Sequence, residues 1–200
     1  EVLENGLVKP EDQPRFLSRI HQEADRLVAL INDILRLSQL DEGGALPHEQ
    51  VSVLELAQEA ARSLTAQAAA QAVHISVTGT AGTVFGVRRL LYEIARNLCE
   101  NAVKYNVSGG SVTVEVAETD RDVTLLVRDT GIGIPEGDQS RVFERFYRVD
   151  KSHSRAIGGT GLGLSIVKHA VAYHHGTLRL ESQPGKGTTI TVTLPKELTE

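Results

Sequence analysis

At residues 97–105 the chain reads NLCENAVKY, inside a helical pattern that extends from about residue 88 to residue 105. Polar side chains recur along this helix at i, i+4, i+7 and i+8 and therefore share one face: Asn97, Asn101, Lys104 and Tyr105. Amide oxygens are neutral hard ligands that suit Mg2+, and a nearby lysine suits a phosphate group. Asparagines on a helix surface are also often merely solvated, so this face needs support from the rest of the chain.

The other side of the same helix is apolar. Leu91, Ile94, Leu98 and Ala102 are spaced for burial against a core. Cys99, the one cysteine of the chain, is expected to be a buried small hydrophobic residue. A single cysteine excludes an intrachain disulfide and a cysteine-cluster metal site, and it fits a reducing compartment.

Composition limits the classes of function. The 200 residues are 40% hydrophobic, enough for a packed core, and their net charge of −5 makes a general nucleic-acid role a poor fit. No apolar run reaches the ~18 residues that span a bilayer and no signal peptide is visible, so we expect no membrane contact by this segment. The sequence starts at Glu1 and contains no methionine, which favours a piece of a longer protein that is itself either free or membrane-anchored.

The first part of the chain predicts one long helix over residues 11–41. Its apolar positions follow a heptad-like spacing: Leu17, Ile20, Ala24, Leu27, Ile31 and Ile34. Further leucines widen this face beyond a two-helix seam, so a four-helix arrangement formed by self-association is expected. Residues 41–44, Asp-Glu-Gly-Gly, predict the end of the helix and a hinge. We therefore expect a helical dimerisation segment over residues 1–43 and a second domain over residues 44–200.

The second domain predicts an α+β fold. Strands are expected near residues 48–52, 74–78, 83–85, 111–118, 122–128, 177–181 and 188–194, and helices near 53–72, 88–105 and 162–174, with a short one after Pro135. Strands follow one another directly at two places and alternate with helices elsewhere. This order favours a two-layer α/β sandwich with a mixed sheet over a doubly wound parallel sheet.

Two glycine-containing segments support a nucleotide site. Asp129-Thr130-Gly131-Ile132-Gly133 follows an apolar strand, where a carboxylate can accept a hydrogen bond from an exocyclic amine such as that of adenine, and glycines let backbone approach a flat ring. A simple acidic turn gives the same pattern. Residues 158–165, GGTGLGLS, open a helix and place backbone N–H groups where they can bind phosphates. The preceding residues are not strand-like, and no P-loop ending is present, so neither a dinucleotide fingerprint nor a P-loop is indicated.

Between these segments lies a basic loop. Residues 141–155 carry five positive and two negative side chains, a local charge of +3 in a chain of −5. A mobile cationic lid here would attract and neutralise a triphosphate. Phe143 and Phe146 are expected to anchor this lid on the core.

Taken together and in this order, the segments resemble the catalytic ATP-binding domain of bacterial sensor histidine kinases. The resemblance rests on residues 97–105, 129–135, 143–150, 159–164 and 185–189, while residues 16–41 are similar to the second helix of that family's dimerisation hairpin. It implies the Bergerat ATP-binding fold, Mg2+ and ATP as ligands, and phosphoryl transfer in two-component signalling.

The resemblance also assigns roles by position. Asn97 and Asn101 would hold Mg2+, Lys104 and Tyr105 would contact phosphate and nucleotide, and Asp129 would bind adenine. Other nucleotide contacts are implied at Gly131, Gly133, Gly159, Thr160, Gly161, Leu162, Gly163 and Thr188. Arg148 is implied as a γ-phosphate contact from the lid. Asn97, Asn101, Lys104 and Arg148 form the implied catalytic set.

The family's phospho-accepting histidine precedes a Glu-Leu-Arg-Thr-Pro-like run that does not occur here. His21 lies on the second helix without the acidic residue that should follow it, so we expect a solvated histidine there and an acceptor upstream of Glu1. The resemblance then implies transfer to a histidine supplied in trans, relay to an aspartate of a response regulator, homodimerisation of the parent and a cytoplasmic location.

Two other interpretations remain at this point. A different member of the ATP-binding superfamily would be an anti-sigma-factor serine kinase or an ATPase clamp, but such clamps carry a carboxylate four residues before the metal-binding asparagine, where Asn97 stands. A non-catalytic nucleotide-sensing dimerisation module is the other alternative.

Overall fold

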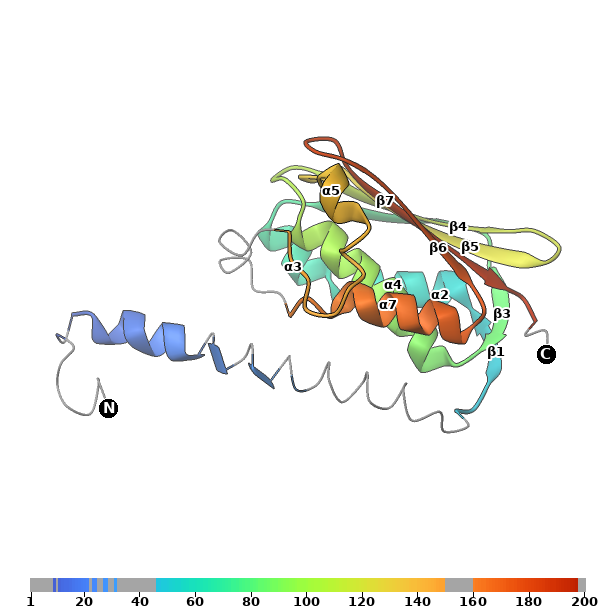
Figure 1. Ribbon diagram of the computed structural model, residues 1–200, viewed down its shortest axis with the longest axis horizontal. Helices are drawn as coiled ribbons and strands as arrows, with labels where there is room; N and C mark the ends of the chain where they lie inside the picture. Colours follow the sequence, from blue (N-terminus) through green and yellow to red (C-terminus); the bar gives the residue numbers. More distant parts are fainter. Residues whose placement is uncertain are drawn as a thin grey trace.

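The computed structural model (Figure 1) describes residues 9, 11–21, 23–24, 27–28, 31, 46–149 and 160–197. The expected hinge at residues 41–44, the part of the basic lid at 150–159 and the implied contact Gly159 lie outside the described residues. The site is therefore built from residues 46–149 and 160–197.

A mixed five-stranded sheet forms one layer of the domain, in the order β2-β4-β5-β7-β6. Its strands are β2 (His74–Gly79), β4 (Ser111–Glu118), β5 (Asp122–Asp129), β6 (Thr177–Gln183) and β7 (Gly187–Pro195). β2 and β4 are parallel and the other neighbours are antiparallel. A separate pair joins β1 (Glu49–Ser52) to β3 (Thr83–Gly86).

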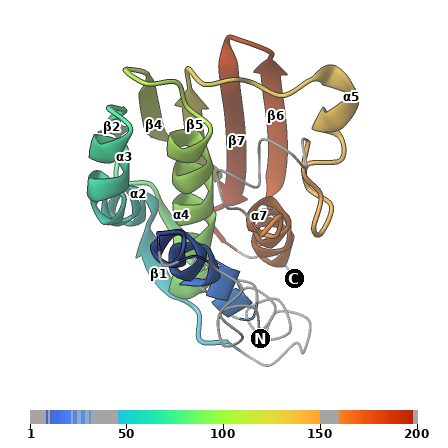
Figure 2. The same ribbon diagram turned by 90° about the vertical axis from the view of Figure 1, so that its left-hand side faces the viewer.

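Helices form the second layer and cover one face of the sheet (Figure 2). They are α2 (Val53–Ser63), α3 (Thr65–Ala70), α4 (Arg88–Lys104) and α7 (Gly163–Tyr173), while the short α5 (Glu136–Gln139) lies beside β6. Residues alternate between buried and accessible along β4 and β5 because successive strand side chains point to opposite faces. The expected α+β sandwich with a mixed sheet is confirmed.

The prediction of a single helix over residues 53–72 is wrong, because two helices, α2 and α3, meet at Leu64. There the N–H of Leu64 bonds to the carbonyl of Ala61, as in a tight turn. The hydroxyls of Ser63 and Thr65 bond to carbonyls three residues earlier. Hydroxyl side chains that compete for backbone groups in this way weaken a helix.

His174 joins the two long helices of the layer. Its Nε2 accepts a hydrogen bond of 3.0 Å from the N–H of Val87, the residue that caps the start of α4. Its Nδ1 lies 2.7 Å from the carbonyl of Ala170 in α7, so this nitrogen carries the proton and donates. Burial lowers the pKa of His174, which keeps the ring neutral in this arrangement.

Residues 13–21 form a helix, as expected for the first part of the chain, and further described residues up to 31 are helical. The apolar side chains described there are exposed: Phe16, Leu17, Ile20, Leu27, Val28 and Ile31. The boundary at residues 43–44 stays a prediction. In the part of the chain that the structure describes, no helix is both long and apolar enough to cross a membrane.

Candidate functional site

The polar face of α4 lies opposite the start of α7. A Cβ added to Gly163 would lie 2.9 Å from Oδ1 of Asn97 and 3.9 Å from Nδ2 of Asn101. The amide oxygen of Asn97 and the amide nitrogen of Asn101 therefore lie near the same point, and a Cβ on Gly163 would have to displace the Asn97 amide. Leu91, Ile94, Leu98 and Ala102 are buried on the other side of the helix, as expected.

The amide nitrogen of Asn97 donates two hydrogen bonds to Glu93. Its Nδ2 donates to the carbonyl oxygen of Glu93 at 2.8 Å and to the carboxylate Oε2 of Glu93 at 3.2 Å. Glu93 is 7% exposed. Sequence reasoning missed this residue, although its place four residues before Asn97 puts it on the same helix face and was visible from spacing alone.

Cationic groups gather at the C-terminal end of α4. Lys104 is half-buried, and burial lowers the pKa of its ammonium group; Glu100 opposes that shift and Arg148 adds to it. Burial raises the pKa of the Tyr105 phenol, and Arg148 opposes this shift. The charge of Arg148, from the first part of the lid, thus acts on both Lys104 and Tyr105. The resemblance assigns all three residues to the nucleotide site.

Asp129 ends β5 and points into the loops that follow. Its Oδ1 accepts hydrogen bonds from the N–H groups of Gly131 at 2.8 Å and of Thr188 at 3.2 Å. Among the described residues no hydrogen bond reaches its Oδ2. Burial raises the pKa of this carboxyl, and the two backbone N–H groups offset part of that effect.

The loop after Asp129 is locked between α4 and the β6–β7 turn. The N–H of Ile132 bonds to the carbonyl of Tyr105 at 3.1 Å, and the N–H of Gly185 bonds to the carbonyl of Ile132 at 2.8 Å. Gly133 has a φ of +69°, and a Cβ there would lie 2.1 Å from the carbonyl oxygen of Gln183. The predicted base-binding residues are thus brought together with the end of α4.

The described part of the glycine segment before α7 forms a tight turn. The hydroxyl of Thr160 accepts a hydrogen bond of 3.2 Å from the N–H of Leu162, and Gly161 has a φ of +75°. The Leu162 side chain is fully buried against Ile166, so this residue contributes to the core as well as to the turn. The carbonyl of Gly161 accepts a hydrogen bond of 2.9 Å from the N–H of Phe146, which joins the glycine segment to the first part of the lid.

The lid begins with a cluster of polar and aromatic contacts. The Tyr147 hydroxyl donates to Asp138, and the Arg141 guanidinium lies 4.2 Å from the centre of the Tyr147 ring. Phe143 is half-buried, but Phe146 is 57% exposed, so its expected anchoring on the core is wrong. Phe146 also adopts a φ of +64°, in the left-handed region that non-glycine residues rarely occupy.

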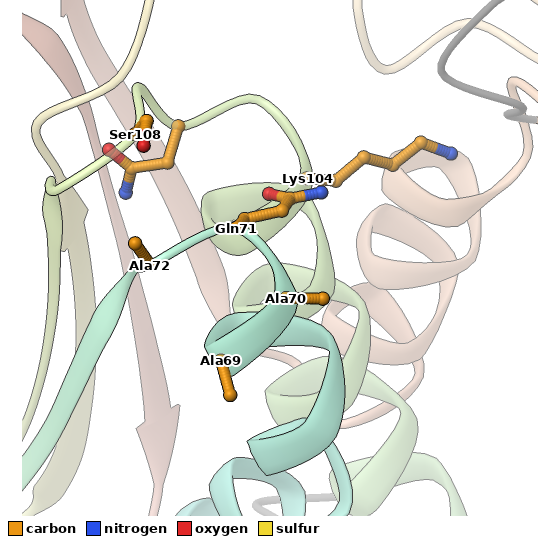
Figure 3. Close-up of a pocket in the computed structure, with 7 residues that line it drawn as sticks. Ala69, Ala70, Gln71, Ala72, Lys104 and Ser108 are labelled. Atoms are coloured by element: carbon orange, nitrogen blue, oxygen red, sulfur yellow. The ribbon is translucent and has the colours of Figure 1, made fainter.

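An open pocket of about 570 Å³ lies between the end of α3 and the residues after α4 (Figure 3). Its lining includes Ala69, Ala72 and Ser108, and Lys104 extends away from these residues at its rim. Asp129 and Asn97 do not line it. The pocket therefore meets the predicted nucleotide-binding residues at Lys104.

Comparisons with known proteins bear on the family and the fold. The family described as histidine kinase-, DNA gyrase B-, and HSP90-like ATPase matches residues 86–198, and the His Kinase A (phospho-acceptor) domain matches residues 1–43. The sensor-like histidine kinase SenX3 of Mycolicibacterium smegmatis is 41% identical over 203 residues, which cover 98% of this chain and 52% of SenX3.

Two solved structures are similar as well. The mycobacterial sensor histidine kinase MprB is 32% identical with a TM-score of 0.66, over 76% of this chain and 100% of that one. Full-length ShkA in complex with AMPPNP is 25% identical with a TM-score of 0.77, over 94% of this chain and 40% of that one.

The chain therefore belongs to the histidine kinase-, DNA gyrase B- and HSP90-like ATPases, and among them it is the ATP-binding kinase portion of a sensor histidine kinase. It spans about half the length of the curated relative SenX3, at 52%.

Proposed function

We propose that this domain binds ATP with its adenine against Asp129. The observation that carries the proposal is the carboxylate itself: Oδ1 is fixed by two backbone N–H groups, so Oδ2 is left to accept a hydrogen bond from the adenine amino group. Gly131 and Gly133 line the approach of the flat ring, and Thr188 fixes the carboxylate from β7.

We further propose that Asn97 and Asn101 hold Mg2+. The donor types fit, because amide oxygens suit this ion and Oδ1 of Asn97 lies beside Gly163, close to the amide of Asn101. When bound, Mg2+ supplies positive charge that neutralises the phosphate oxygens. Lys104 and Arg148 would add their charges near the C-terminal end of α4, and the N–H groups at the start of α7 would bind the phosphates. Thr160 and Gly161 hold the turn before that helix, and Gly159 and Tyr105 remain proposed contacts.

The proposed reaction moves the γ-phosphoryl group to a histidine nitrogen of the helical hairpin. The imidazole nitrogen attacks the γ-phosphorus, the bond to the bridging oxygen breaks, and ADP leaves. No side chain of the domain acts as a covalent nucleophile, because phosphoryl transfer depends mainly on positioning and charge neutralisation. We propose further relay to a response-regulator aspartate, homodimerisation through the exposed apolar helix and a cytoplasmic location.

An ATPase clamp is the second candidate function. It would need a carboxylate base at the position of Asn97, where an amide cannot take a proton from water. An anti-sigma-factor serine kinase and a non-catalytic dimerisation module lack a specific observation in their favour.

Calorimetry with ATP tests the binding proposal. We expect binding that tightens with Mg2+, and we expect Asp129→Ala to weaken it roughly 100-fold, as for loss of a charge-assisted hydrogen bond. Gly137→Ala is the matched control, because a Cβ at Gly137 meets nothing within 4 Å. Equal affinity in Asp129→Ala and wild type would refute the adenine assignment.

Transfer of radiolabel from ATP tests the reaction. We expect label on a supplied hairpin segment that carries the acceptor histidine and none on this chain alone. Labelling of the chain alone that survives His21→Ala would show that the acceptor assignment is wrong.

A further inference from the structure

We propose that Glu93 is a positioning residue that fixes the metal-binding amide of Asn97. The inference rests on the proposed function, in which Asn97 and Asn101 hold Mg2+. Glu93 lies one helical turn before Asn97 on α4 and is only 7% exposed. A carboxylate is rarely buried to this degree without partners that use it.

The hydrogen bonds decide which way the Asn97 amide points. An amide nitrogen has two hydrogens to donate, and for Asn97 both find acceptors on Glu93, at 2.8 Å and 3.2 Å. The backbone carbonyl of Glu93 cannot donate a hydrogen bond, so the nitrogen rather than the oxygen of the Asn97 amide must face Glu93. Oδ1 of Asn97 is thereby turned to the opposite side.

The opposite side is the proposed metal position. Oδ1 of Asn97 points at the space beside Gly163, which the amide of Asn101 also reaches. Without the carboxylate, the Glu93 carbonyl would hold only one hydrogen of the amide, so the amide would be held less firmly in this orientation. The two Glu93 acceptors also limit rotation of the amide, as partners behind a metal ligand generally do.

This role separates Glu93 from a catalytic base. The carboxylate acts through Asn97 and is not required to touch the nucleotide. Its contribution should therefore appear in the Mg2+-dependent part of ATP affinity, and adenosine binding at Asp129 should not change.

The experiment measures ATP affinity with Mg2+ and with EDTA in wild type, Glu93→Leu and Glu93→Gln. We expect the gain in affinity from Mg2+ to fall roughly tenfold in Glu93→Leu, in the range found for partners of metal ligands. Glu93→Gln retains an acceptor oxygen and should recover most of the gain. Adenosine affinity should be equal in all three proteins. A general structural defect would instead change the adenosine affinity as well.

A double-mutant cycle with Asn97→Ala completes the test. If Glu93 acts through Asn97, Glu93→Leu should have no further effect on the Mg2+ gain in the Asn97→Ala background. Independent effects of the two substitutions, or an unchanged Mg2+ gain in Glu93→Leu, would overturn the inference. Should Glu93→Leu not fold, Glu93→Ala carries the same cycle. Absence of any Mg2+ gain in wild type would instead refute the proposed metal site.

Discussion

The two ends of α4 share one helix but are held in different ways. At the N-terminal end, the N–H of Val87 is capped by His174, which comes from α7. At the C-terminal end, Lys104 and Tyr105 lie half-buried beside Arg148, and the carbonyl of Tyr105 accepts the N–H of Ile132. The N-terminal end is fixed by a buried side chain, and the C-terminal end carries cationic side chains that suit an anionic ligand.

This difference predicts which substitutions should change stability and which should change nucleotide affinity. Changes at the N-terminal end and on the buried face should lower stability and leave the intrinsic affinity for nucleotide unchanged. Changes on the polar face should lower affinity and leave stability unchanged. Glu93 combines the two kinds of position, because it is buried and also bonds to Asn97 on the polar face.

Cys99 gives the largest expected effect and tests the buried face of α4. Burial raises the pKa of its thiol from 9.0 to about 12, so the reactive thiolate should be about 1,000-fold scarcer near neutral pH, at tenfold per pH unit. We expect labelling by iodoacetamide only after unfolding in guanidinium, followed by mass spectrometry. Fast labelling of the native protein would show that this face opens without global unfolding.

His174→Ala tests the N-terminal end. The substitution leaves the N–H of Val87 without its acceptor in a buried place, so we expect a loss of about 2–3 kcal/mol in the free energy of unfolding. Urea denaturation measures this loss, and ATP affinity below the transition should match wild type. A stable variant with weakened ATP binding would contradict the division between the two ends.

The same histidine predicts a pH dependence of stability. Its folded pKa lies below the ordinary value of 6.5, so the unfolded state binds the proton more tightly. Wild-type stability should therefore be complete above 6.5 and fall as the pH drops through that value, and His174→Ala should lack this component. Melting temperatures across this range provide the comparison, and equal slopes in both proteins would argue against the assignment.

Gly163→Ala tests the polar face with a single methyl group. The new Cβ would lie 2.9 Å from Oδ1 of Asn97 and must displace the amide. We expect roughly tenfold weaker binding of ATP with Mg2+, as for disturbance of a metal ligand, and little change with EDTA. Gly137→Ala again serves as the control, and calorimetry on both variants decides whether the position matters.

The smallest expected effect is the pH dependence of adenosine affinity that Asp129 causes. Its carboxyl must be ionised to accept from adenine, and burial raises its pKa above the ordinary 3.8. Affinity for adenosine should therefore weaken as the pH falls toward the raised pKa, with little change above neutral. Asp129→Asn should bind more weakly but without this pH dependence. Parallel curves for the two proteins would exclude Asp129 as the titrating group.

Much of the fold follows from local pattern. The spacing of Leu91, Ile94 and Leu98 predicts the buried face of α4, and alternation along β4 and β5 predicts the sheet strands. The break at Leu64 was not predicted, because hydroxyl side chains that bond back to the helix leave the apolar period unchanged. The exposure of Phe146 was missed for a similar reason, since an aromatic residue in a loop does not reveal its backbone angle.

The sequence by itself determined which residues have the chemistry for a nucleotide site: the amides of α4, Asp129 at a strand end and the glycines around it. It also contained the Glu93–Asn97 spacing, because i, i+4 pairs are local. Only the tertiary structure decided that the N–H of Thr188 bonds to Asp129, that His174 caps α4 and that Gly163 faces Asn97. These pairs are far apart in the chain, and their meeting depends on strand order and helix packing, which residue periodicity does not encode.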